Sequence, residues 1–452
     1  MSPDSPPLKR QRPGEKPRVG TCALADRIAR VACDRYAALV APSSSLAPTR
    51  TVLAAFVALD RATDALDVIA LGVGTKTIAR GVVITGRELL DAHAEVLARR
   101  GLKKFFFEAA KRRRRGDELA RVEKFIDFDI STNAMAMKPG VELHFYVSSA
   151  PCGNACVRRW AKGERVTTRR DDLGTNGTPV EAHAPLARSA VDQGQVGLCV
   201  KISKARKDEM LPENVREMVA RGEVAPGTAP VGFALGASLT CGDKVCVWNV
   251  VGYQGALLRK FISEPVRVRS IVVGRKFSAP HLRRAVCCRV DGFETRCGGF
   301  KATHPALMET AVVFDDVPMD ADEGATFDNP FAMVWCAFDD EGEILNSKTG
   351  RMFAGEGDAA TPSSTCKAAF FASYGELCGD VRAYTPEEYR RAKHDADPQY
   401  DAAKDELFNH PKMFEPRRDC RGWHENKYKK TSGYERGRVE SFCARIEHRV
   451  SE

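Results

Sequence analysis

The sequence predicts an α/β protein: a mixed β-sheet flanked by helices, followed by a mostly helical C-terminal part. Two apolar runs, residues 52–59 and 66–71, are separated by a polar turn and are expected to pair as strands. A third run, residues 141–149, alternates apolar and polar residues as a strand does. Between the second and third runs, apolar residues recur at helical spacing from Val96 to Phe106. Strands that alternate with helices are typical of this fold class.

The remaining segments follow in chain order. Residues 1–20 are basic and expected to be disordered, and residues 21–50 form an N-terminal segment with a helix at about 24–40. We expect one large domain over residues 51–448, in which the helical part begins near residue 360. Residues 158–237 are polar and interrupted, so we expect mainly loops near the mouth of a site.

Composition indicates an intracellular protein in the cytoplasm or nucleus. A chain of 452 residues with 43% hydrophobic residues is long enough to bury a substantial core. We see no apolar run that would span a membrane, no secretory signal, and no export context for the 15 cysteines, which we expect to be reduced. Most of these thiols, the pair Cys287-Cys288 among them, are interpreted as small buried apolar residues without chemistry. The basic run at residues 7–12 matches a nuclear import signal.

The tripeptide His93-Ala94-Glu95 is the strongest indication of chemistry. Asp91 is expected to cap a helix, which puts His93 and Glu95 in its first turn. Pro151-Cys152-Gly153 follows a predicted strand, and Pro151 suits the first position of a second helix. A histidine and two thiolates leave the fourth corner of a tetrahedral Zn²⁺ site open to water, whose pKa then falls from ~15.7 to ~7. Spacing alone leaves the second thiolate open between Cys156 and Cys246, because neither is excluded by geometry.

The chain resembles the adenosine-to-inosine editase domain shared by tRNA-specific and double-stranded-RNA-specific adenosine deaminases. Four segments carry the likeness: residues 71–76, 91–100, 148–153 and 241–258. The resemblance implies a cytidine-deaminase-like core, with His93, Cys152 and Cys241 as zinc ligands and Glu95 as the catalytic residue that moves protons. Gly242 and Cys156 depart from the pattern, standing where a small hydroxyl residue and, in the double-stranded-RNA editors, an arginine are usual.

The same resemblance assigns Thr75 and Lys76 to the pocket that holds the flipped nucleotide. From the residues alone, this Gly-Thr-Lys segment also fits a turn at the end of a strand. A base in an RNA loop is already partly unstacked, so turning it into such a pocket costs less than extrusion from a duplex.

Two Tyr-x-x-x-Lys pairs form the second pattern, Tyr389 with Lys393 and Tyr400 with Lys404. Asp397-Pro398 predicts that they lie on separate helices, and amphipathic surface stripes are one interpretation of them. The resemblance gives another, a buried inositol hexakisphosphate. The residues it implies as ligands are Arg99, Arg100, Lys244, Lys367, Tyr389, Lys393, Tyr400, Lys404 and Trp423. Val247 and Asn426 stand where relatives usually carry cations, so the shell is expected to be thinner there.

We expect the partner to be tRNA, with the adenosine 3′ of the anticodon of alanine tRNA as the substrate. Fewer than about a hundred residues precede His93, which leaves no room for a separate double-stranded-RNA-binding domain in front of the core. We expect a monomer with no membrane partner. Other interpretations are an editing deaminase of other structured RNA, a silent RNA-binding relative, and a structural zinc protein. The net charge of +9 and the basic run at residues 111–115 suit RNA, although such a run at a helix end is equally typical of a solvated tail.

Overall fold

A computed structural model describes the chain in segments. They are residues 22–41, 51–78, 82–120, 122–129, 131–153, 155, 199–201, 228–230, 239–296, 299–314, 330–353, 360–410 and 413. The predicted import signal, Cys156, Trp423, Asn426 and most of the predicted loop segment at 158–237 lie outside these residues.

An eight-stranded mixed sheet forms the centre of the molecule, in the order β11-β10-β7-β1-β2-β12-β13-β14. Its strands are β1 (Leu53–Asp60), β2 (Ala65–Val73), β7 (Val141–Ser149), β10 (Ser270–Arg275), β11 (Ala306–Glu309), β12 (Phe331–Cys336), β13 (Glu343–Asn346) and β14 (Arg351–Met352). β1 runs antiparallel to β2 and β7, whereas β10 runs parallel to β7 and β11. The predicted pairing of the first two strands and the predicted strand β7 are confirmed.

Three two-stranded sheets accompany the large one. They are β3 (Thr75–Thr77) with β4 (Asp91–His93), β5 (Ile126–Phe128) with β6 (Met135–Met137), and β8 (Cys199–Lys201) with β9 (Thr228–Pro230).

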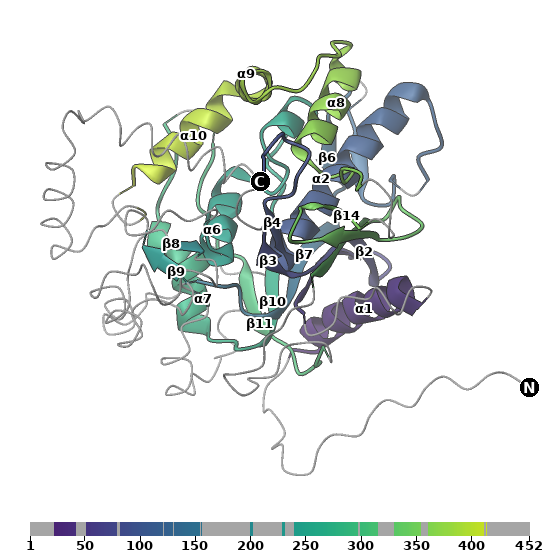
Figure 1. Ribbon diagram of the computed structural model, residues 1–452. Coiled ribbons are helices and arrows are strands. Elements are labelled where there is room, and N and C mark those ends of the chain that lie inside the picture. The colour runs from purple at the N-terminus through teal and green to yellow at the C-terminus, as the bar shows by residue number, and fades with distance from the viewer. Residues whose placement is uncertain are drawn as a thin grey trace, which may run out of the picture.

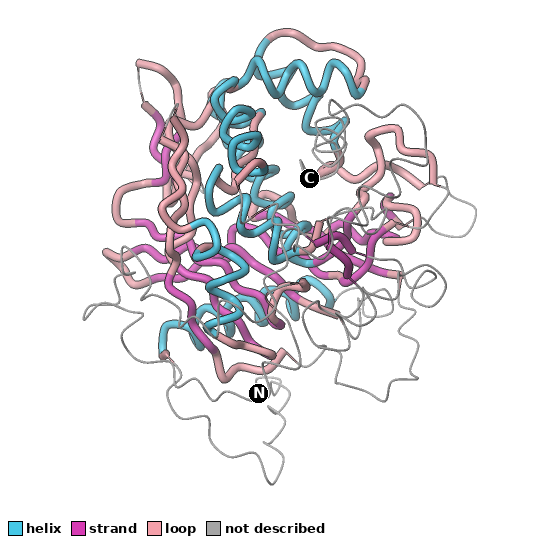
Figure 2. Tube along the Cα trace, turned by 90° about the vertical axis from the view of Figure 1, so that its left-hand side faces the viewer, coloured by secondary structure: helices cyan, strands magenta, loops and turns pink. Residues whose placement is uncertain are grey.

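Helices cover both faces of the sheet, so the central strands are buried on both sides. In β1, Leu53, Ala55 and Val57 face a cluster that includes α1 (Ala23–Val40). The alternate residues, Phe56 among them, face the larger core around α2 (Ala94–Arg115) and α6 (Cys241–Val251). Figures 1 and 2 show the strands gathered in one layer, with α1 on one side of it. The predicted N-terminal helix is thus confirmed.

The remaining helices extend the larger core. They are α7 (Ala279–Val286), α8 (Lys367–Cys378), α9 (Pro386–Ala396) and α10 (Pro398–Phe408), with the short 3₁₀ turns η4 (Leu257–Lys260) and η5 (Cys288–Val290). α9 and α10 lie far from α1 (Figure 1), and Asp397 caps α10 by accepting from Tyr400 N at 3.0 Å. The helical C-terminal part and the break at Asp397-Pro398 are therefore confirmed. No helix in the described part of the chain is long and apolar enough to cross a bilayer.

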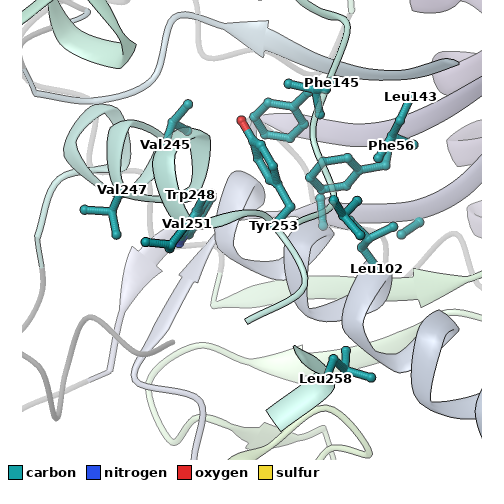
Figure 3. Close-up of a cluster of buried hydrophobic side chains, with 14 of the residues drawn as sticks. Phe56, Leu102, Leu143, Phe145, Val245, Val247, Trp248, Val251, Tyr253 and Leu258 are labelled. Atoms are coloured by element: carbon teal, nitrogen blue, oxygen red, sulfur yellow. The ribbon is translucent and has the colours of Figure 1, made fainter. Parts of the chain in front are cut away.

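An aromatic cluster joins α6 to the sheet (Figure 3). The Tyr253 ring lies 5.4 Å from the ring of Phe56 and 5.9 Å from that of Trp248, and Phe56 stacks on Phe145 at 4.6 Å. Each fully buried aromatic side chain contributes roughly 1.5–3 kcal/mol by leaving water. This packing fixes α6 relative to the sheet, and with it the residues at the start of that helix.

Two local predictions were wrong. Asp91 does not cap α2; it lies in strand β4, and His93 is the N-cap. Pairing of residues 91–93 with β3 extends this segment, which delays the start of the helix to Ala94. The second helix does not begin at Pro151 either, because residues 151–153 form a bend.

Candidate active site

The junction between β4 and α2 positions His93 and Glu95. Strand pairing sets Thr75 opposite His93 and Lys76 opposite Ala92, so the predicted nucleotide-binding residues lie beside the predicted metal ligand. Gly74 permits this approach. Its φ is +155°, and a Cβ there would lie 2.1 Å from the carbonyl oxygen of Ala92. Glu95 is buried in the first turn of α2, with 3% of its surface exposed.

Asp91 orients the imidazole of His93. Its Oδ1 accepts from the backbone N of His93 at 3.0 Å and lies 2.7 Å from His93 Nδ1. Its Oδ2 accepts from Lys244 Nζ at 2.8 Å, and both partners of this ion pair are fully buried. A carboxylate can only accept, so Nδ1 carries the proton and Nε2 keeps the lone pair, as in carboxylate–histidine–zinc arrangements.

Cys152 and Cys241 meet at the start of α6. The backbone N of Cys241 donates to Cys152 Sγ at 3.3 Å, and the N of Gly242 donates to the Cys152 carbonyl at 3.0 Å. Gly153 makes room for this contact: at its φ of +94°, a Cβ would lie 2.3 Å from Thr240 Oγ1. The sulfur of Cys152 thus lies at the N-terminus of a helix, an environment that favours negative charge.

Two other thiols were candidates for the second sulfur ligand, Cys156 and Cys246. Cys156 lies outside the described residues. Cys246 lies five residues after Cys241 on α6, about 140° around the helix from it. It contacts Arg289, and burial raises the pKa of its thiol.

The buried ion pair between Lys244 and Asp91 connects these pieces. Lys244 lies in the first turn of α6, three residues after Cys241, and Asp91 lies two residues before His93. A hydrogen bond from the Cys241 backbone thus reaches the sulfur of Cys152, and the Lys244–Asp91 pair connects the start of α6 to the strand that bears His93. It does not close a compact donor group of His93 with Cys152 and Cys241. Within the described residues, only Cys287, Cys288 and His304 have three such donor atoms all within 4.8 Å of one another.

The donor set fits zinc by its chemistry. One imidazole and two thiolates are the borderline and soft ligands that Zn²⁺ takes, and three protein ligands correspond to a catalytic site with one open position. The carboxylate on His93 adds the orienting partner that such histidines have.

A second region lies further along α2. It is a cavity lined by several cationic side chains, and we call it the cation cavity. Its described walls come from α2, α6, α9, α10 and residues 255–257, which lead into η4. They consist of Arg99, Lys103, Val247, Trp248, Gly255, Ala256, Leu257, Tyr389, Lys393, Tyr400 and Lys404. Four of these are cationic and none is acidic. Burial, helped by the charges of Arg99 and Arg100, holds the pKa of Lys103 well below its ordinary value.

Contacts with aromatic rings and backbone carbonyls hold these cations. Arg99 donates to the Tyr253 carbonyl at 2.9 Å and stacks over the Trp248 ring at 4.7 Å. Lys103 Nζ lies 4.1 Å from the centre of the Phe370 ring. Burial raises the pKa of Tyr400 to about 12, so its hydroxyl stays a donor at neutral pH.

Some of the residues predicted to bind a polyphosphate line the cation cavity, and others lie elsewhere. Arg99, Tyr389, Lys393, Tyr400 and Lys404 line the cation cavity. Arg100 donates to the Thr365 carbonyl, Lys244 pairs with Asp91, and Lys367 is buried at the start of α8. Trp423 lies outside the described residues.

Sequence reasoning missed Lys103. It follows Arg99 by one helical turn, which is the available signal, but it precedes Lys104, so the two look like a solvated pair. Val247, where the resemblance expects a cation, lines the same cavity, so Lys103 supplies charge that Val247 does not.

The basic run at residues 111–115 is engaged by the protein itself. Arg114 donates to the carbonyls of Glu376 and Leu377 at the end of α8, and Arg115 pairs with Glu376. Arg112 and Arg113 stack over Phe338 and Phe128. The run ends α2 about 30 Å from Glu95, at 1.5 Å per helical residue. These contacts favour the structural interpretation of the run over an RNA contact near the site.

Comparisons with known proteins place the chain in a family. Residues 70–415 match the model described as the adenosine-deaminase (editase) domain. The double-stranded RNA-specific editase Adar of Drosophila melanogaster is 28% identical over 348 residues, 76% of this chain and 45% of that protein. The double-stranded RNA-specific adenosine deaminase of Mus musculus is 27% identical over 382 residues, 78% of this chain and 28% of that protein.

A tRNA-specific relative matches a shorter part. The tRNA-specific adenosine deaminase 1 of Drosophila melanogaster is 30% identical over 247 residues, 54% of this chain and 53% of that protein. The chain spans about half or less of the length of these curated relatives. Because the family model covers most of the chain and both zinc-motif segments, this protein belongs to the adenosine-deaminase (editase) domain family.

Proposed function

We propose that the protein is a zinc-dependent hydrolytic deaminase that converts adenosine to inosine in RNA. The observation that carries the proposal is the buried Lys244–Asp91 pair, which ties the strand bearing His93 to the helix that begins at Cys241. Cys152 already contacts that helix. The ligands of the proposed zinc are His93, Cys152 and Cys241.

Each side chain has a defined task in this proposal. Zinc, when bound, lowers the pKa of a water ligand to about 7. Glu95 takes a proton from the attacking water and delivers it to the ring nitrogen next to C6; it then takes the proton of the new C6 hydroxyl and delivers it to the amino group, which leaves as ammonia as the C6 carbonyl forms. Its buried position at the first turn of α2 keeps bulk water away from this transfer. Thr75 and Lys76, opposite β4, hold the sugar and phosphate of the flipped nucleotide.

We propose tRNA as the substrate, at the adenosine 3′ of the anticodon of alanine tRNA. The 30% identity to a tRNA-specific relative supports this choice. A second candidate is another structured RNA, because the double-stranded-RNA relatives align over 76–78% of this chain, against 54% for the tRNA-specific one.

We also propose that inositol hexakisphosphate fills the cation cavity as a structural cofactor. Four cationic side chains line the cavity, three of them buried, with no carboxylate among the described lining residues. A polyanion would neutralise them, and each uncompensated buried charge costs several kcal/mol. Lys103 joins the predicted ligands in this proposal.

The test incubates the full chain separately with total tRNA and with a fully paired RNA duplex, and reads inosine as A-to-G changes by sequencing. We expect conversion 3′ of the anticodon in alanine tRNA, and none with Glu95→Ala, which should retain its zinc. Conversion confined to the duplex would replace tRNA by the second candidate. No A-to-G change in either RNA, or full activity in Glu95→Ala, would overturn the proposal.

A further inference from the structure

Cys287, Cys288 and His304 form a compact donor group at the C-terminal end of α7. Cys287 is the C-cap of α7, Cys288 opens the turn η5, and His304 precedes β11. The two sulfurs lie 3.7 Å apart, and Cys288 Sγ lies 3.8 Å from His304 Nδ1. All three donor atoms lie within 4.8 Å of one another. The sequence alone suggested that these adjacent thiols are small buried apolar residues without chemistry. In the structure they lie beside a histidine that follows Cys288 by 16 residues.

These separations match the edges of a tetrahedral zinc site. With Zn–S bonds of about 2.3 Å and a Zn–N bond of about 2.0–2.1 Å, tetrahedral geometry puts two sulfurs about 3.8 Å apart. The same geometry puts sulfur and nitrogen about 3.6 Å apart. A disulfide would instead need an S–S distance of about 2.05 Å.

The second nitrogen of His304 is already oriented for such a role. His304 Nε2 lies 2.9 Å from Asp291 Oδ1. Because the carboxylate only accepts, Nε2 carries the proton and Nδ1 presents its lone pair to the thiols. Ligating histidines almost always donate their other N–H to a carboxylate, a carbonyl or water, which fixes the tautomer and raises the basicity of the ligand.

One buried side chain braces both arms of the group. Asn249 on α6 donates to the carbonyls of Thr303 and Val286, the residues that precede His304 and Cys287. Its Oδ1 accepts from Thr303 Oγ1 at 2.6 Å. The ligands are therefore held by the fold before any ion binds, which lowers the entropic cost of binding.

Burial and access also suit an ion. Cys287 is fully buried and the His304 side chain is 6% exposed, whereas Asp291 is 61% exposed and Cys288 is partly exposed. A metal would thus enter from the side of Cys288 and Asp291. Two thiolates balance the charge of a divalent cation, so the loaded group is neutral where it is buried.

We propose that Cys287, Cys288 and His304 bind a second Zn²⁺ that fixes the junction of α7, η5 and β11. The site shares no residue with the proposed catalytic zinc. Its fourth position is open to water on the exposed side. Binding releases the two thiol protons.

The test measures zinc per chain in the full protein, by elemental mass spectrometry after removal of loosely bound metal, and uses no RNA. Cys288→Ser and His304→Ala are each expected to lose one equivalent relative to the wild type. Cys378→Ser, a half-buried thiol at the end of α8, is the matched control and should lose none.

A surface substitution keeps the test decisive if those variants fail to fold. Asp291→Asn changes an exposed carboxylate and should weaken binding of one zinc 10- to 100-fold in competition with a chelator. Glu294→Gln, an exposed acid on the same segment, should not. Unchanged zinc content in both ligand variants, unchanged affinity in Asp291→Asn, or a wild-type mass showing a Cys287–Cys288 disulfide would overturn the proposal.

Discussion

Glu95 and Arg99 are one helical turn apart on α2, yet they lie in opposite electrostatic settings. Glu95 follows the His93 imidazole, which the Asp91 carboxylate orients, and the proposed thiol ligands Cys152 and Cys241 meet at the start of α6. The neighbours of Arg99 are lysine and tyrosine side chains that line one cavity. One helix therefore carries residues of a region suited to a metal ion and, one turn further along its axis, residues of a region suited to a polyanion. In our proposal, each region binds a ligand of charge opposite to its own.

Removing a metal ligand should give the largest effect. His93→Ala and Cys241→Ala are each expected to lose zinc and to lower inosine formation by more than about 10⁴-fold, because water is then no longer activated at neutral pH. Cys246→Ser, on the same helix as Cys241 but on another face, is the control and should keep activity. Rapid deamination by His93→Ala would show that the metal side of the comparison is misassigned.

The link between β4 and α6 on the metal side is the next test. Asp91→Asn leaves the ammonium of Lys244 buried beside a neutral amide, which should destabilise the fold by about 3–5 kcal/mol. The same change should weaken zinc binding 10- to 100-fold. Urea unfolding measures the first effect and chelator competition the second. The double variant Asp91→Asn/Lys244→Met should recover much of the stability and none of the zinc affinity; equal stability of single and double variants would argue against the buried pair.

Lys103→Met probes the polyanion side. Loss of one charge-assisted contact of about 1.5–3 kcal/mol should weaken binding of inositol hexakisphosphate roughly 10- to 100-fold. The measurement is the rise in melting temperature as the ligand is titrated into stripped protein. Lys111→Met, further along α2 and outside the cavity, is the control. Identical titrations for the two variants would remove Lys103 from the site.

The pH dependence of the stripped protein is a smaller effect. Burial holds the pKa of Lys103 well below its ordinary value of 10.5 in the folded state. Between those two values the unfolded chain binds a proton that the folded chain does not, so stability rises with pH, by up to about 1.4 kcal/mol per pH unit. This contribution to the stability is lost as the pH falls through the same window. Urea midpoints measured toward pH 10 should show this slope in the wild type and a flatter one in Lys103→Met; a falling stability of the stripped wild type would contradict it.

The sequence indicated those parts of the fold that depend on local patterns. The first strand pair, the strand before Pro151 and the break at Asp397-Pro398 follow from periodicity and capping chemistry, which act over a few residues. The start of α2 was misplaced because pairing with β3, an interaction between segments about 16 residues apart, keeps Asp91 in a strand.

The site residues that were missed depend on longer-range geometry. Lys103 and Lys104 are adjacent and identical, yet one faces the cation cavity and the other pairs with Asp339 at 2.6 Å. Lys244 donates to Asp91, 153 residues earlier, and sequence reasoning did not predict this partner. Only the packing of α6 on the sheet decides between such partners, and no local spacing reports it.

Glu95→Gln tests the central claim most directly, because it removes the proposed catalytic carboxyl and leaves every described residue that lines the cation cavity unchanged. Inosine formation and the inositol hexakisphosphate released on denaturation would be measured on the same preparation. We predict a 10²- to 10⁴-fold fall in the rate of inosine formation, with polyphosphate content equal to that of the wild type. An unchanged rate, or loss of the polyphosphate together with the activity, would contradict the assignment of the two regions to two independent ligands.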